Sequence, residues 1–290
     1  MQGYFSFSLR IFYYIQGVSQ WTKRQNDAFS FVPTMGALHA GHLALVENAK
    51  ALDKPVLVSI FVNPAQFNNA EDLQKYPRTL TQDLLVLSQA GVDAVYLPVT
   101  EDLYPEGLAE VNLDLGVLDR VFEGQKRPGH FKGVVKVLHR LFSVLNPEDV
   151  FFGQKDLQQC LVVEKLIDKH FPRIHQHNIP TQRDPQTGLA LSSRNMRLSD
   201  AGLKLAGAIN WSLQLALRGN SVDEGLAEAE SFLKIKGVAI EYLEVVSLPN
   251  MQPTKEIVDK KTAAVFAGYV EGVRLIDNHI YEHIPEVVPF

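Results

Sequence analysis

The chain turns from a predicted strand, 28–32, into a predicted helix, 39–51, at Pro33-Thr34-Met35-Gly36-Ala37-Leu38-His39-Ala40-Gly41-His42. Gly36 permits a tight turn between the two elements, and Gly41 permits a close approach to the backbone. A strand followed by a helix is the repeating unit of a parallel sheet with helices on both sides. In such sheets, ligands bind beyond the carboxyl ends of the strands. This connection therefore predicts both the fold class and the location of the site.

The alternation of strands and helices continues through the first two thirds of the chain. The apolar run 56–62 is typical of a strand that is buried on both faces, and 133–145 carries the apolar stripe of a helix. Alternating apolar residues over 5–11 predict a first strand, which leads into a helix. We therefore predict an α/β fold with a parallel sheet in a first domain, residues 1–181.

A polar segment rich in proline, glycine and serine, 180–200, follows this domain and has the composition of a loop or hinge. Two helices come next, and then strand-like segments at 238–246 and 263–270. The second of these helices opens with Ser221 and Glu224 at the spacing of a capping box. These features predict a second, smaller α+β domain at residues 182–290.

Bulk composition excludes several classes of function. The chain has 290 residues, a net charge of −5 and a pI near 6.0, so it lacks the strongly basic surface expected of a nucleic-acid-binding protein. No apolar run is long enough to cross a bilayer. Its single cysteine, Cys160, excludes an internal disulfide and zinc sites based on paired cysteines. We expect a cytoplasmic protein with neither a membrane nor a nucleic-acid partner.

Two histidines lie three positions apart at the start of the predicted helix. His39 and His42 would meet the free N–H groups and the positive dipole end of that helix, which is a favourable place for phosphate. Two imidazoles there can donate hydrogen bonds to a triphosphate and stabilise charge during group transfer. The alternative is a pair of polar histidines on a surface helix. The absence of any Gly-Lys pair excludes a P-loop.

Other polar segments follow strands or open helices, where a site would lie. Lys155 offers a compact positive charge for phosphate, and Asp156 can accept hydrogen bonds from ribose hydroxyls. Gln66 and Gln159 are neutral side chains that suit a hydroxylated acid, which itself carries the negative charge. The serines and the arginine of 191–195 suit a leaving pyrophosphate.

The HxGH spacing and the later Ser-Ser-Arg loop resemble the HxGH nucleotidyl-transferase superfamily, which cleaves ATP between its α and β phosphates. A more specific resemblance is to the pantothenate synthetase family, also called pantoate–β-alanine ligases. Seven segments occur in that family's order between residues 33 and 278: PTMGALHAGH, FVNPAQF, KYPRTL, RPGHFKGV, FFGQKDLQQ, GLALSSRN and RLIDN.

The resemblance implies a Rossmann-like domain with a smaller C-terminal lid domain, and a homodimer. It implies the condensation of pantoate with β-alanine, with ATP and Mg²⁺, through a pantoyl-adenylate intermediate. AMP and pyrophosphate are the other products.

The resemblance also implies roles for individual residues. The expected catalytic residues are His42, His39, Lys155 and Arg194. The expected ATP contacts are Pro33, Met35, Gly41, His42, Gly153, Lys155, Asp156, Gln182, Leu191, Ser192, Ser193 and Arg194. The expected contacts to pantoate and β-alanine are Gln66, Gln159, Asn63 and Arg127. Asp83 matches a carboxylate proposed as a metal contact, and is the expected Mg²⁺ contact.

The residues leave two other functions open. One is a nucleotidyltransferase of the same superfamily that attaches AMP to a phosphorylated acceptor; the paired glutamines and the second domain argue against it. The other is a catalytically silent nucleotide-binding paralogue. The intact histidines, lysine and arginine argue against it, because a silent site would be free to lose them.

Overall fold

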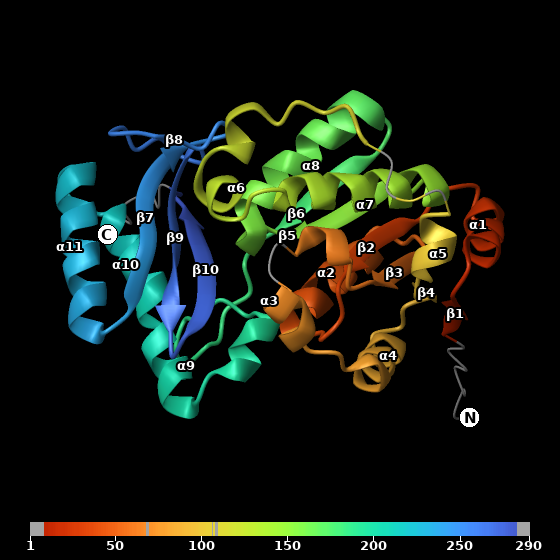
Figure 1. Ribbon diagram of the computed structural model, residues 1–290, viewed down its shortest axis with the longest axis horizontal. Coiled ribbons are helices and arrows are strands. Elements are labelled where there is room, and N and C mark those ends of the chain that lie inside the picture. The colour runs from red at the N-terminus through yellow and green to blue at the C-terminus, as the bar shows by residue number, and fades with distance from the viewer. Residues whose placement is uncertain (1–8, 68–69, 106, 108–109, 283–290) are drawn as a thin grey trace, which may run out of the picture. The chain divides into compact units, whose positions relative to one another are not determined.

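A computed structural model describes residues 9–67, 70–105, 107 and 110–282 of the chain. The fold consists of two compact units, Met1–Gln182 and Arg183–Phe290 (Figure 1). The expected domain boundary, at residue 181, lies one residue before the end of the first unit. Phe5 and Phe7 of the predicted first strand lie outside the described residues.

A six-stranded parallel sheet forms the centre of the first unit. Its strands, in chain order, are β1 (Arg10–Phe12), β2 (Ser30–Thr34), β3 (Val56–Ile60), β4 (Ala94–Tyr96), β5 (Asp149–Gly153) and β6 (His175–Ile179). Their order in space is β1-β4-β3-β2-β5-β6. The chain runs outward from β2 to β3 and β4 on one side, and from β5 to β6 on the other. The order therefore reverses between β2 and β5, which is where open α/β sheets bind their ligands.

Helices cover both faces of this sheet. α1 (Ile15–Arg24), α7 (His130–Leu145) and α8 (Leu157–His170) lie on one face, and α2 (Ala40–Lys50) and α4 (Leu80–Gln89) on the other (Figure 1). Alternate residues of a strand point to opposite faces. In β2, Phe31 packs edge-on against Phe142 of α7 with ring centroids 6.4 Å apart, whereas Val32 joins a buried cluster with Leu45 and Leu87.

Shorter elements complete the first unit. They are η1 (Pro64–Gln66), α3 (Ala70–Lys75), α5 (Thr100–Leu103), η2 (Gly116–Asp119), α6 (Phe122–Lys126) and η3 (Gln154–Asp156). Of these, η1 follows β3 and η3 follows β5, so both begin at the carboxyl edge of the sheet. The predicted α/β class and parallel sheet are thus confirmed.

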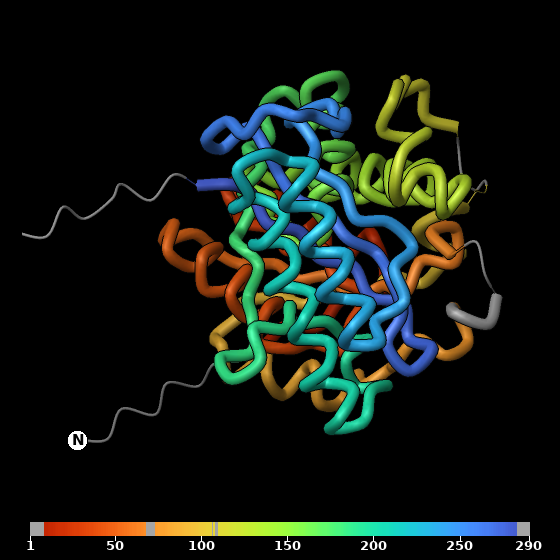
Figure 2. The backbone as a smooth tube through the Cα atoms, turned by 90° about the vertical axis from the view of Figure 1, so that its left-hand side faces the viewer, coloured from red at the N-terminus to blue at the C-terminus, as the bar shows by residue number. Residues whose placement is uncertain are grey.

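The second unit is a four-stranded antiparallel sheet with helices. Its elements are η4 (Ser193–Arg197), α9 (Asp200–Ala206), α10 (Ala208–Ala216), α11 (Val222–Lys236), β7 (Ala239–Ser247), β8 (Gln252–Pro253), β9 (Thr262–Val270) and β10 (Val273–Ile280). The strand order is β10-β9-β7-β8. Figure 2 shows α10 and α11 side by side across this sheet, where Leu213 and Leu233 share a buried core with Phe266. Ser221 caps α11 by accepting from the Glu224 N–H at 3.2 Å, as its spacing predicts.

Three strands, the two-residue β8 among them, have no counterpart among the predicted elements. β6 is polar and lies at the edge of its sheet, and its pattern of exposure does not alternate. β10 follows a two-residue turn after β9, and the turn contains Gly272 with a φ of +74°. No helix in the described part of the chain combines the length and the hydropathy that a membrane span requires.

Candidate active site

The turn between β2 and α2 carries the two histidines. Gly36 adopts a φ of +79°, and Ala37 follows with a φ of +51°. A Cβ atom at Gly36 would lie 2.9 Å from Ile60 Cγ2 and 3.0 Å from Asp83 Oδ2. Both the positive φ and this lack of space require glycine. The predicted glycine turn is therefore present, and β3 and α4 enclose it.

His39 and His42 cap α2 reciprocally. The helix begins at Ala40, so His39 is its extended N-cap rather than its first turn. His39 Nδ1 accepts from the Gly41 N–H at 3.1 Å, and His42 Nδ1 accepts from the His39 N–H at 3.3 Å. The two rings lie 4.1 Å apart, centroid to centroid. A backbone N–H can only donate, so each Nδ1 is unprotonated and each neutral ring carries its proton on Nε2.

Burial and neighbouring charge keep both rings neutral. Burial lowers the pKa of His39 to about 3; the nearby His42 and Lys155 add to this effect, and Asp156 opposes it. Burial, followed by the charge of Lys155, lowers the pKa of His42 to about 4. Lys155 and Asp156 belong to η3, after β5. The structure therefore brings four predicted residues together where β2 and β5 end, with two neutral Nε2–H donors beside one cation.

Asp83 holds the histidine turn in place. This carboxylate is only 2% exposed and accepts from the Ala37 N–H at 3.0 Å and the Leu38 N–H at 2.9 Å. A third bond, of 3.0 Å, comes from the Thr79 hydroxyl. Both carboxylate oxygens are thus used by protein donors. These contacts account for a buried carboxylate at this position, and the expected Mg²⁺ contact at Asp83 stays a prediction.

Asn63 also has a local structural role. Its side chain is buried, and its Oδ1 accepts from the Ala65 N–H at 3.3 Å while its Nδ2 donates to the Gly133 carbonyl at 3.4 Å. Asn63 therefore caps η1 and ties it to α7. Its expected contact with the acid substrate stays a prediction.

Gln66 and Arg127 lie close together, and His130, which was not among the predicted site residues, connects them. Arg127 Nη2 lies 3.5 Å from the Gln66 carbonyl. His130 lies between them, with Nε2 at 3.0 Å from Arg127 Nη1 and Nδ1 at 2.8 Å from the Gln66 carbonyl. The histidine in the segment RPGHFKGV was the available signal.

Two adjacent glutamines on α8 face different surroundings. Gln158 is buried; its Oε1 accepts from the Glu123 N–H at 3.1 Å, and its Nε2 donates to the carbonyls of Leu118 and Val121. Gln158 thus fastens the segment 118–123 to α8. The predicted ligand, Gln159, is half-buried. Sequence alone does not distinguish these neighbours, because the difference lies in which helix face meets that segment.

The predicted pyrophosphate loop belongs to the second unit. Ser192 caps η4 by accepting from the Arg194 N–H at 3.3 Å, and Ser193 is buried. A short hairpin precedes this loop, with Arg183 paired antiparallel to Ala190. Arg183 anchors it to β10, since its guanidinium donates to Asp277 at 2.6 and 3.1 Å. Asp277 lies in the RLIDN segment, which thereby acquires a structural role. Of the other expected ATP contacts, Gln182 is exposed at the end of the first unit, where its Nε2 donates to the Pro180 carbonyl at 3.1 Å.

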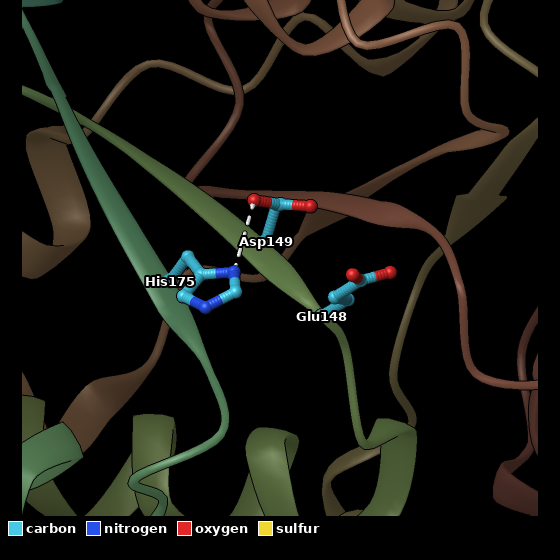
Figure 3. Close-up of side chains that lie close together, drawn as sticks. All are labelled: Glu148, Asp149 and His175. Carbon is cyan, nitrogen blue, oxygen red and sulfur yellow. Dashed lines mark ion pairs between the residues drawn. The ribbon is translucent and has the colours of Figure 1, made fainter.

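One group of histidine and carboxylate side chains in the described residues is compact enough to hold a metal ion. It comprises Glu148, Asp149 and His175, whose ligand atoms lie within 4.8 Å of one another (Figure 3). Lys54 already supplies a cation there, with its ammonium 2.6 Å from Asp149 and 3.1 Å from Glu148. Asp149 and His175 begin β5 and β6, so the group lies at the sheet edge opposite the histidine turn. We interpret it as a structural ion cluster.

Comparison with known proteins identifies the family. The family model described as pantoate-beta-alanine ligase matches residues 10–280. The chain belongs to the pantoate-beta-alanine ligase family. It is 42% identical over 264 residues to the pantothenate synthetase of Cytophaga hutchinsonii, a match covering 88% of this chain and 92% of the relative. It is 44% identical over 263 residues to that of Ruegeria sp., covering 89% and 92%.

Solved structures of pantoate-beta-alanine ligases share the fold. The crystal structure of pantothenate synthetase from Thermus thermophilus matches with a TM-score of 0.88 and 39% identity, over 95% of this chain and all of that one. The ligase from Francisella tularensis, complexed with beta-gamma ATP and beta-alanine, matches with a TM-score of 0.80 and 33% identity, over 96% of this chain and all of that one. Family membership makes the chain a ligase.

The protonation state of the histidine pair leads to a first prediction. The unfolded chain protonates both rings near pH 6.5, whereas the folded chain protonates them only near pH 4 and pH 3. The free energy of unfolding therefore falls as the pH drops from 6.5 to about 4, by up to about 1.4 kcal/mol per pH unit for each histidine. Urea unfolding of the native chain and of the double variant His39→Gln/His42→Gln, at pH 7 and pH 5, measures this effect. Equal pH dependence in both proteins would contradict the neutral pair.

The contacts of Asp83 lead to a second prediction. Asp83→Asn replaces one acceptor oxygen by an NH₂ group that must face a backbone N–H or a hydroxyl hydrogen, so the free energy of unfolding should fall by about 1–3 kcal/mol. Asp114→Asn is the matched control, because the Asp114 carboxylate accepts from the Gly116 N–H at an exposed position. If Asp83 served only as a metal contact, unfolding would be unchanged and the Mg²⁺ dependence of the reaction would shift instead.

Proposed function

We propose that this chain catalyses the ATP-dependent condensation of pantoate with β-alanine, through a pantoyl-adenylate intermediate. The observation that carries the proposal is the pair of neutral Nε2–H donors of His39 and His42, beside Lys155, where β2 and β5 end. These groups match the needs of a triphosphate, and family membership supports the identity of the two substrates.

In the first step, a carboxylate oxygen of pantoate attacks the α-phosphorus of ATP. A new oxygen–phosphorus bond forms, and the bond to the pyrophosphate oxygen breaks, so pyrophosphate leaves with the electron pair. Negative charge grows on the leaving group during this step. Fixed N–H donors and a lysine stabilise that charge without reorganising, and no protein nucleophile is required. We assign these roles to His42, His39 and Lys155, with Arg194 binding the leaving pyrophosphate.

In the second step, the amine of β-alanine attacks the carbonyl carbon of the adenylate. The carbon–nitrogen bond forms, AMP leaves with the electron pair of the former acyl–oxygen bond, and the nitrogen loses a proton to solvent water. Gln66 and Gln159 are the proposed ligands of pantoate, with Gln66 also near β-alanine. Asn63 and Arg127 are proposed to contribute to the same subsite.

We further propose that Mg²⁺ accompanies ATP. This ion keeps most of its bonds to phosphates and water, so it would neutralise triphosphate charge while the protein contributes few ligands. Asp83 is the proposed protein contact. A homodimer and a cytoplasmic location complete the proposal; the homodimer rests on the resemblance to the family, and the location on the single cysteine, which fits a reducing compartment.

A third prediction tests the reaction itself. The purified protein, given ATP, Mg²⁺ and pantoate, should release AMP and pyrophosphate at a rate that rises strongly when β-alanine is added, with pantothenate as product. His42→Ala should slow adenylate formation by at least about a hundredfold, because a preorganised donor to the developing charge is lost. Adenylation within about tenfold of the native rate would refute the role of His42. Release of pyrophosphate only with a phosphorylated acceptor would indicate the alternative nucleotidyltransferase.

A fourth prediction separates the two substrate sites. Gln66→Ala should raise the KM for pantoate by about tenfold or more, the effect of losing hydrogen bonds to a charged group, and leave the KM for ATP within about twofold. Initial rates measured at varied pantoate and at varied ATP provide the test. Gln176→Ala is a suitable control, since Gln176 lies on β6 and contacts Cys160 and Asn178. Damage to ATP binding alone would show that Gln66 is misassigned.

A further inference from the structure

The proposed acid subsite is assembled from two segments that are far apart in the sequence. Gln66 ends η1, after β3, whereas Arg127 is the C-cap residue of α6. His130 opens α7, and its ring contacts both residues. A role for His130 in substrate binding rests on the proposed function, because Gln66 and Arg127 are proposed substrate ligands.

The hydrogen bonds determine the tautomer of His130. A guanidinium group has donors only, so the bond of 3.0 Å between Arg127 Nη1 and His130 Nε2 requires Nε2 to accept. The proton of the neutral ring therefore lies on Nδ1, which donates to the Gln66 carbonyl at 2.8 Å. This tautomer is the opposite of the one deduced for His39 and His42. A cationic ring would have an N–H group facing the guanidinium and would lose the bond to Arg127.

The surroundings of His130 favour the neutral ring. The side chain is about nine-tenths buried, and burial lowers its pKa to about 4. The charge of Arg127 adds to this effect, whereas the bond to the Gln66 carbonyl and the carboxylates of Glu123 and Asp156 oppose it. Glu123 also pairs with Arg127 at 3.7 Å. Arg127, His130 and the Gln66 backbone carbonyl thus form a hydrogen-bonded bridge. Over the physiological pH range its imidazole is uncharged, and Arg127 carries the charge.

Backbone packing fixes the frame in which His130 acts. A Cβ atom at Gly133 would lie 2.0 Å from the Ala65 carbonyl oxygen and 3.0 Å from the Gln66 nitrogen, so η1 lies directly against the first turn of α7. Asn63 ties the same two elements from the other end of η1. Gly129, with a φ of +82°, turns the chain from Arg127 into the helix. Within this frame, the imidazole makes the shorter link between the guanidinium and the Gln66 backbone carbonyl, beside the direct contact of 3.5 Å from Arg127 Nη2.

We propose that His130 is a positioning residue that holds Arg127 and Gln66 in one rigid wall of the acid subsite. It does so as a neutral ring that donates through Nδ1 and accepts through Nε2. Loss of the ring would remove the 3.0 Å bond to Arg127 and the 2.8 Å bond to the Gln66 backbone carbonyl, and would leave the guanidinium oriented by the longer contacts to Glu123 and Gln66. The effect should fall on the acid substrate, because Gln66 and Arg127 are its proposed ligands, whereas the histidine turn is held by bonds that do not involve His130.

Three substitutions at His130 dissect the bridge. Asn places its amide near the position of Nδ1 and can keep the bond to Gln66, whereas Gln places its amide near Nε2 and can keep the bond to Arg127. His130→Ala should raise the KM for pantoate at least about tenfold, with the KM for ATP within about twofold, as expected for lost hydrogen bonds to a charged group. His130→Asn and His130→Gln should each recover part of that loss, and neither should reach the native value. His139→Ala is the control and should leave both constants unchanged, because His139 lies on the same helix but packs against His170 and Phe171.

A second measurement determines the tautomer of His130 and does not depend on catalysis. In the full-length protein with isotope-labelled histidine, long-range proton–nitrogen NMR spectra at neutral pH should show His130 as the neutral Nδ1–H tautomer. The His130 signals are assigned from their loss in His130→Gln. In Arg127→Ala, the Nε2 acceptor loses its donor, and its nitrogen resonance should shift.

The outcomes separate this inference from the proposed function. An Nε2–H tautomer or a cationic ring at neutral pH would overturn the bridge, whatever the activity. The bridge is equally overturned if His130→Ala leaves the KM for pantoate unchanged, or if the KM values for pantoate and ATP rise together in proportion to lost stability. A native protein that makes no pantothenate would overturn the proposed function instead. The tautomer measured by NMR would then decide whether His130 bridges Arg127 and Gln66.

Discussion

The contact between Asp83 and the turn after β2 is the constraint on which the site depends. A strand-to-helix turn with two successive positive φ values leaves backbone N–H groups that no helix or sheet partner can satisfy. A buried carboxylate from α4 accepts two of them, and this bond pattern fixes where α2 starts. Because His39 is the N-cap of that helix, the position of both imidazoles follows from the same contact. The charge of Asp83 therefore stabilises the turn, and it affects the chemistry through the positions of the two histidines.

A second theme is the use of hydrogen-bond direction to define histidine tautomers. His39 and His42 accept backbone N–H groups at Nδ1 and so present Nε2–H, whereas His130 accepts a guanidinium at Nε2 and so presents Nδ1–H. His130 is buried and His39 and His42 are half-buried, and loss of water around a ring disfavours its charged form. The electrostatics of the first unit then rest on permanent cations such as Lys155 and Arg127, while the imidazoles serve as fixed neutral donors. This arrangement suits a reaction in which charge moves between phosphate oxygens.

Several polar residues in or beside segments that carry expected ligands are structural. Gln158 fastens the segment 118–123, and Arg183 with Asp277 anchors a hairpin in the second unit. Each lies beside or within a segment that carries expected ligands, so motif position alone does not separate scaffold from ligand. Burial and hydrogen-bond partners do, because a buried polar side chain must satisfy its donors and acceptors within the protein.

Local pattern was sufficient for much of this protein. The glycine turn, the apolar strand β3, the stripe of α7 and the cap of α11 follow from backbone conformation, period and composition, which neighbouring residues determine. The edge strand β6 escaped detection because its side chains are polar and only its pairing with β5 makes it a strand. The approach of Lys155 to the histidines, the contacts of Asp83, the difference between Gln158 and Gln159 and the bridge through His130 were decided by the tertiary structure alone. Each joins elements distant in sequence, and the partner that satisfies a buried polar group is known only once the chain has packed.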